Sequence, residues 1–99
     1  MRRVSNLAFN REFPAATGMT GLPADNTVFL RLDHQNPYDP DAVGVWLDTR
    51  PDVPVGWLYR KDNNRSVVLQ ALNQGKVLQG RVQLRTPRSN GQKIVVFWL

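Results

Sequence analysis

The chain has 99 residues, one histidine, no cysteine and a formal net charge of +5. This length suits a single domain, residues 1–99, and the absence of cysteine excludes disulfides and cysteine-based zinc sites. Hydrophobic residues make up 41% of the chain, which is enough for one modest core. No apolar run approaches the ~20 residues needed to cross a membrane. We therefore expect a cytoplasmic domain without a membrane partner.

Positive charge is concentrated in the second part of the chain. Residues 60–99 contain eight lysines and arginines against one aspartate, whereas residues 1–59 contain five arginines and seven acids. Clustered basic side chains attract phosphates, so this distribution favours a polyanionic partner. The alternative interpretation is an arginine-rich surface that serves only solubility.

Short apolar runs separated by turn residues predict a β-rich domain. The first strand is expected at 3–9 and is followed by a Gly- and Pro-rich segment, 14–25, that reads as an exposed loop. Alternation of apolar and polar residues predicts a second strand at 27–32. Residues 35–41 contain two prolines and cannot form a regular strand, so we expect a tight turn there, with a helical turn over 40–42 as an option.

Two further strands and one helix are expected in the middle of the chain. The strands are predicted at 42–47 and 55–58, and Gly56 in the second indicates a bulge or a close approach of two backbones. The one convincing helix is expected at 62–74, because Gly75 stands where a helix commonly ends.

The helix is expected to begin with Asp62 or Asn63 as its N-cap. Two strands, 77–85 and 94–99, complete the chain, and Asn90-Gly91 between them is a strong hairpin signal. The predicted fold is all-β with a helical insertion (β-rich α+β), a small OB-like or SH3-like six-stranded β-barrel with one main helix. Closure of the barrel would leave no strand edge exposed.

The sequence contains few of the parts that an enzyme needs. His34 is the one histidine, and no phosphate-binding glycine loop or nucleophile elbow is present. A metal site would have to use Asp33, His34, Asp39 and Asp41. A metal-dependent hydrolase or nuclease built on His34, Asp39 and Asp41 is a minor alternative. We predict no catalytic activity, no cofactor and no metal.

Two motifs resemble the HIRAN family. The first is Asn-Pro-Tyr-Asp-Pro-Asp-Ala-Val at 36–43, and the second is Val-Gly-Trp-Leu-Tyr-Arg at 55–60. Their order and spacing match that family over residues 27–82. Phe9 and Arg11 stand near an aromatic-basic pair of its N-terminal strand. The chain is therefore identified as a free-standing HIRAN-like domain.

The resemblance implies an OB-like barrel that captures the 3′ end of single-stranded DNA, as in helicase-like fork remodellers. It implies that Tyr38 stacks on the terminal base and that Asp39 or the nearby backbone contacts the terminal 3′-hydroxyl. Trp57 stands where the family has His or Tyr, and Arg60 matches a phosphate-contacting position. It also implies a role in DNA repair, with a helicase or another repair or replication protein as partner and nucleoid association when bound to DNA.

The chemistry of the residues agrees with binding of single strands, which requires aromatic faces for bases and a basic track for phosphates. The candidate platforms are Tyr38, Trp57, Tyr59 and Phe9. Arg81 and Arg85, on one face of the strand at 77–85, could extend the basic track. The predicted nucleic-acid-binding residues are Phe9, Arg11, Tyr38, Asp39, Trp57, Arg60, Lys61 and Arg65.

Each of these residues also has a purely structural interpretation. Tyr38 could pack over the barrel end, Asp39 could cap the following turn, and Trp57 could belong to the core. Trp46 and Trp98 are expected in the core rather than at a contact surface. The alternative function is a protein-interaction adaptor that docks through a sheet edge at the C-terminal strand. Steep salt dependence would favour phosphate binding over docking.

Overall fold

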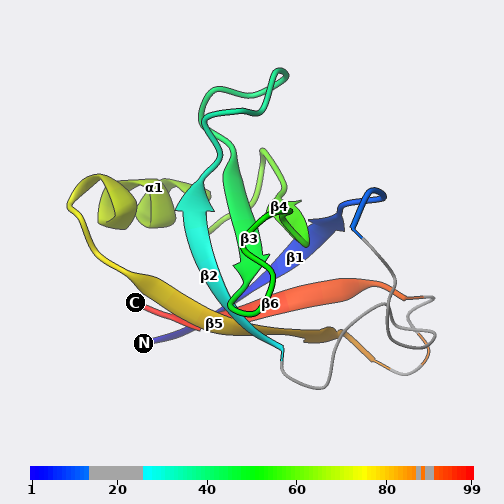
Figure 1. Ribbon diagram of the computed structural model, residues 1–99. Helices are drawn as coiled ribbons and strands as arrows, with labels where there is room; N and C mark the ends of the chain where they lie inside the picture. The colour runs from blue at the N-terminus through cyan, green and yellow to red at the C-terminus, as the bar shows by residue number, and fades with distance from the viewer. Residues whose placement is uncertain (14–25, 87, 89–90) are drawn as a thin grey trace.

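The computed structural model describes the chain except for residues 14–25, 87 and 89–90. Within the described residues the chain forms six strands and one helix (Figure 1). The strands are β1 (Arg2–Phe9), β2 (Thr27–Leu32), β3 (Val43–Leu47), β4 (Gly56–Leu58), β5 (Leu78–Leu84) and β6 (Lys93–Trp98), and the helix is α1 (Arg65–Asn73). The predicted loop at 14–25 lies outside the described residues, as does part of the predicted Asn90-Gly91 turn.

The six strands close into an antiparallel barrel in the order β1-β4-β3-β2-β5-β6. β6 pairs with β1 on one side and with β5 on the other, which completes the ring. The predicted class, a small β-rich barrel with one helix, is thereby confirmed. Because both sides of β6 are paired, this strand has no free edge of the kind that the adaptor alternative would use.

Alternation along the strands builds the core. Inward positions hold mainly aliphatic side chains, with the Phe97 ring among them, and together they fill the narrow barrel. β5 shows the predicted pattern, with Leu78 and Val82 buried while Gln79 and Arg81 face solvent. The fully buried side chains include Leu7, Val28, Leu30, Val43, Val45, Leu47, Val82, Val95 and Phe97.

Gly56 marks the predicted close approach of two backbones. A Cβ atom at this position would collide with the carbonyl oxygen of Ala8 and would lie 2.9 Å from Cγ of Leu7. Phe9 pairs with Gly56, and Ala8 pairs with Trp57, in the register of β1 and β4. A residue without a side chain therefore lets these two strands meet.

The helix begins later than predicted, at Arg65, and its N-cap is Asn64 rather than Asp62 or Asn63. The carboxylate of Asp62 accepts hydrogen bonds from the Ser5 hydroxyl and the Asn64 backbone N–H, each at 2.9 Å. The buried Asn64 amide donates to the Val4 carbonyl oxygen at 3.0 Å. These side chains tie the start of α1 to β1, which the sequence pattern alone could not reveal.

The rest of the helix follows the prediction. Val68 and Ala71 are buried against the barrel, and Leu72 packs beside them. Gly75 follows the end of α1 with a φ of 81°, as expected. Residues 40–42, where a helical turn was an option, form a hydrogen-bonded turn and no helix. In this turn the Ala42 N–H donates to the Asp39 carbonyl oxygen at 3.2 Å. Other element ends differ from the predicted ones by one residue, an ordinary uncertainty.

No helix among the described residues is long and apolar enough to cross a membrane.

Candidate nucleic-acid interface

A broad groove of about 1190 Å³ lies on the outer side of the barrel. Among its lining residues, Trp46 of β3 and Trp57 of β4 are half-buried, and we call them its floor. The lining residues Tyr38, Arg60 and Arg11 are exposed, and we call them its rim. We call this the front groove. Strands β3 and β4 are neighbours in the sheet, so the two indoles come from adjacent strands.

Trp46 is not a core residue, contrary to the prediction. It is half-buried, and it lies two residues after Gly44 on the outward side of β3. A Cβ atom at Gly44 would lie 2.5 Å from the Trp46 ring, so that ring lies over the glycine. Gly44 pairs with Trp57 in the register of β3 and β4. Gly44 thus makes room for the Trp46 indole beside the Trp57 position. The Gly-x-Trp spacing in the sequence was the pattern that could have indicated this outward placement of Trp46.

Trp57 is held in place by a hydrogen bond. Its indole Nε1–H donates to Oδ2 of Asp33 at 2.8 Å, and the other oxygen of that carboxylate accepts the Gln35 N–H at 3.2 Å. The sequence suggests only a metal-ligand role for Asp33, so this contact is an addition from the structure. The bond fixes the ring of a half-buried tryptophan without burying it in the core, so one side of the indole stays at the groove.

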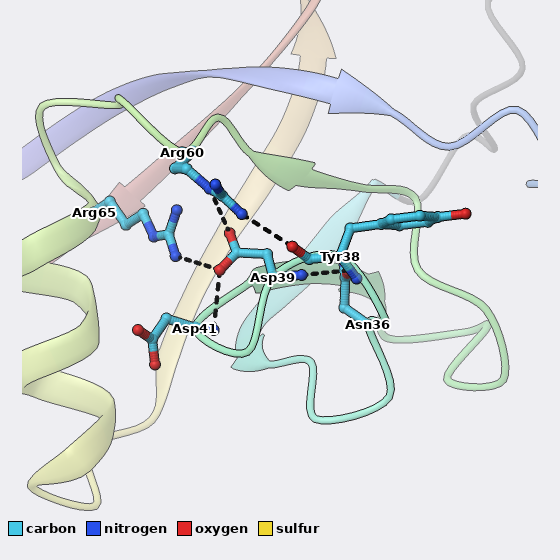
Figure 2. Close-up of polar contacts among 6 residues, drawn as sticks. All are labelled: Asn36, Tyr38, Asp39, Asp41, Arg60 and Arg65. Carbon is cyan, nitrogen blue, oxygen red and sulfur yellow. Dashed lines mark hydrogen bonds and ion pairs between the residues drawn. The ribbon is translucent and has the colours of Figure 1, made fainter.

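The first motif forms a loop stabilised by its own polar side chains. Oδ1 of Asn36 accepts the backbone N–H groups of Tyr38 and Asp39 at 2.9 and 3.1 Å. Oδ1 of Asp39 in turn accepts the Asp41 N–H at 3.1 Å (Figure 2). Asn and Asp are suited to such local turns because their short side chains reach backbone donors two residues on. The loop between β2 and β3 thereby has a defined shape.

This loop presents Tyr38 to solvent. The residue is 86% exposed, and its ring points away from the polar cluster around Asp39 (Figure 2). Packing of Tyr38 over the barrel end, one of the structural interpretations, is therefore wrong. An exposed tyrosine on the rim of a groove is a suitable platform for a nucleobase.

Asp39 is the centre of an ion-pair cluster. Its Oδ1 lies 2.9 Å from Nη2 of Arg65, and its Oδ2 lies 3.6 Å from Nε of Arg60. The hydrogen bond from Arg65 is the largest reason that the pKa of the Asp39 carboxyl is lowered, and the backbone N–H of Asp41 lowers it further. Asp39 therefore joins the loop to the first turn of α1, in addition to capping the turn.

The two arginines of this cluster differ in accessibility. The Arg65 side chain is 11% exposed and is committed to Asp39, whereas the Arg60 side chain is 67% exposed. Arg60 also donates from Nη2 to the Tyr38 carbonyl oxygen at 2.9 Å. Arg60 thus lines the groove with part of its guanidinium exposed to solvent. Arg65 is largely buried and holds Asp39 in place.

The charge of the front groove is mixed. Arg11, Arg31 and Arg60 line it, but so do several carboxylates. The acidic lining residues are Glu12, Asp33, Asp39 and Asp52. Of the predicted basic track, Arg60 lines this groove, whereas Lys61, Arg65, Arg81 and Arg85 do not.

Three other candidates lie at the margins. Phe9 lines the groove but packs largely into the barrel end, with an edge-to-face contact to Phe13 at 6.0 Å and the Lys93 ammonium 4.3 Å from its ring. Lys61 and Tyr59 are exposed but do not line the groove. No three His, Asp or Glu side chains among the described residues gather as metal ligands, so the His34, Asp39 and Asp41 set of the minor hydrolase alternative is not assembled.

Comparison with known proteins gives information on the fold alone. No protein-family model matches this chain. No curated protein sequence matches it either. A crystal structure of a protein from Lactobacillus plantarum, determined by a structural genomics consortium, is similar with a TM-score of 0.61 at 18% identity. The alignment covers 98% of this chain and 96% of that one, so the similarity extends over the whole barrel.

Proposed function

We propose that the protein is a nucleic-acid-binding module of the HIRAN type whose front groove binds single-stranded DNA. The observation that carries this proposal is the Tyr38 ring, 86% exposed at the rim of a groove floored by two tryptophans. Stacking of bases on aromatic side chains contributes roughly 1–3 kcal/mol per base. The role is binding rather than catalysis.

The geometry supports different roles for the residues of the front groove. Tyr38, Trp46 and Trp57 provide stacking surfaces, and the exposed part of Arg60 is available for a phosphate at the same rim. Asp39 and Arg65 hold the loop that presents Tyr38, through their 2.9 Å ion pair. We propose that both act mainly by positioning, because Oδ1 of Asp39 already accepts hydrogen bonds from Arg65 and the Asp41 N–H, and Oδ2 forms an ion pair with Arg60 at 3.6 Å.

The test is a fluorescence-anisotropy titration with four labelled oligonucleotides of matched sequence. They are single-stranded DNA with a free 3′-hydroxyl, the same strand with a 3′-phosphate, blunt duplex DNA, and RNA. We expect the single strands to bind more tightly than the duplex at moderate salt. A preference for the free 3′-hydroxyl would support end capture as well. Failure of both single strands to bind would contradict the proposal and favour a protein partner.

A further inference from the structure

The strands β5, β6 and β1 form one side of the barrel and carry basic residues. None of the three strands contains Asp or Glu. Their outward positions, with the residue that follows β5, include Arg2, Arg81, Arg85 and Trp98. We call the surface formed by these four residues the back face. Here the basic surplus of the chain is not offset by acidic side chains on the same strands.

Strand register places these residues on one surface. Arg2 pairs with Trp98 between β1 and β6, and Arg81 pairs with Val96 between β5 and β6. The Arg85 guanidinium donates from Nη1 to Oδ1 of Asn6 at 3.2 Å, which brings it across β6 to β1. All three arginines are exposed.

Arg81 and Arg85 donate to neutral side chains. Arg81 donates to the Asn26 amide oxygen at 3.3 Å, as Arg85 does to Asn6. The ion pairs recorded among the described residues instead use Arg50, Arg60 and Arg65. An amide oxygen orients a guanidinium without cancelling its charge. The arginines of the back face therefore keep their charge available for an anion.

An aromatic ring accompanies this charge. Trp98 is 52% exposed, contrary to the expectation that it belongs to the core. Together with Arg81, Thr27 and Gln79 it lines a shallow hollow of about 350 Å³. A tryptophan ring can pack against the apolar part of a ligand while a neighbouring arginine contacts its phosphate.

The back face points away from the front groove. In the ring order β1-β4-β3-β2-β5-β6, β3 and β6 stand opposite each other. The groove carries carboxylates among its arginines, whereas the strands of the back face carry none. A ligand held by its phosphates is thus better matched to the back face than to the groove.

We propose that the back face binds the phosphodiester backbone of a duplex, while the front groove holds unpaired bases. The proposal rests on the proposed function for the class of partner but uses a different set of residues. Arg2, Arg81 and Arg85 contact phosphates, and Trp98 packs against the sugar edge. A phosphate contact of this kind positions a duplex without reading its sequence. The module would then bind where single and double strands meet.

The test measures the affinity for blunt duplex DNA of about 16 base pairs, a length that offers phosphates but few unpaired bases. The variant is Arg81→Gln/Arg85→Gln, and the matched control Arg50→Gln/Lys76→Gln removes the same charge from outside β1, β5 and β6. Each lost phosphate contact lowers the slope of log K against log salt by about 0.9. We expect a slope smaller by about two in the variant and little change in the control.

Tyr38→Ala separates this proposal from the proposed function. We expect it to weaken single-strand binding and to leave duplex binding unchanged. If the two double variants lower duplex affinity equally, the charge is acting non-specifically and the back face is not a site. If the wild-type protein does not bind the duplex at all, the proposal is also overturned, whatever the single-strand result.

Discussion

Tyr38 and Asp39 are adjacent in the chain, yet they have opposite environments. The tyrosine ring is almost fully exposed, whereas the aspartate is bound by Arg65 and by the Asp41 backbone N–H. The resemblance to HIRAN domains implies a base contact for Tyr38 and a contact to the 3′-hydroxyl from Asp39 or the nearby backbone. The geometry instead supports a contact role for Tyr38 and a positioning role for Asp39. The motif could be recognised in the sequence, but this division depends on Arg65, which lies in another element.

Replacing Tyr38 with alanine tests its contact role. We expect Tyr38→Ala to weaken single-stranded DNA binding by roughly 5- to 150-fold, the equivalent of about 1–3 kcal/mol of lost stacking. The midpoint of urea unfolding should not change, because the ring packs on nothing. Tyr59→Ala is the matched control, since Tyr59 is exposed but does not line the groove. Equal losses of affinity in both variants would contradict the assignment.

Asp39 makes stability depend on acid pH. Its pKa is lowered in the folded state from the ordinary value of 3.8, chiefly by the Arg65 hydrogen bond. The stabilisation is therefore fully present above the unfolded pKa and is lost as the pH falls through the lower, folded pKa. We expect Asp39→Asn to lower the free energy of unfolding at pH 7 by about 1–3 kcal/mol and to flatten its decline below about pH 4.

Urea unfolding from pH 7 down to pH 2 measures this effect. Asp52→Asn is the control, because Asp52 forms an exposed pair with Arg50 and exposed pairs contribute little. If the free energy of unfolding of Asp39→Asn declined below about pH 4 as steeply as that of the wild type, the cluster would not stabilise the loop.

At the scale of elements, the strands were predictable and the helix start was not. Alternation in β5 and the apolar run of β6 determine strand positions through local pattern alone. The start of α1 depends on the contact of Asn64 with β1, which lies about sixty positions away in the chain. The outward placement of Trp46 likewise depends on Gly44 and on the neighbouring strand, so hydrophobicity alone predicted it wrongly.

Alanine substitutions at Gly56 and Gly44 are expected to affect stability and single-strand binding differently. A Cβ atom at Gly56 meets the backbone of Ala8, whereas one at Gly44 meets the far end of the Trp46 ring. We expect Gly56→Ala to lower the free energy of unfolding by about 1–3 kcal/mol, because backbone cannot move aside easily. Gly44→Ala should cost less stability, since the indole can turn away, but should weaken single-strand binding. Urea unfolding and anisotropy titration of both variants measure this contrast, and equal loss of stability would contradict it.

At the scale of the molecule, charge and aromatic rings are distributed over two opposite faces. The net charge of +5 was evident from the sequence and predicted a polyanionic partner. Which face carries the uncompensated charge was not evident, because it depends on barrel closure and on the pairing of Arg60 and Arg65 with Asp39. The front groove is therefore expected to bind through stacking and the back face through phosphates.

The chain contains three tryptophans, and they report on both faces. Trp46 and Trp57 line the front groove, and Trp98 lies on the back face. Each indole N–H gives its own signal in a proton–nitrogen correlation NMR spectrum. A single-stranded DNA of about six nucleotides is within the range of site sizes for one OB-type module.

The most direct test of the central claim is to titrate the labelled protein with this oligonucleotide and follow the three indole signals. We predict that the signals of Trp46 and Trp57 shift together with the amides of residues 36–39, and that Trp98 shifts little at low oligonucleotide concentration. Shifts confined to Trp98, or no shift at Trp46 and Trp57 at saturation, would contradict the assignment of the front groove as the single-strand site.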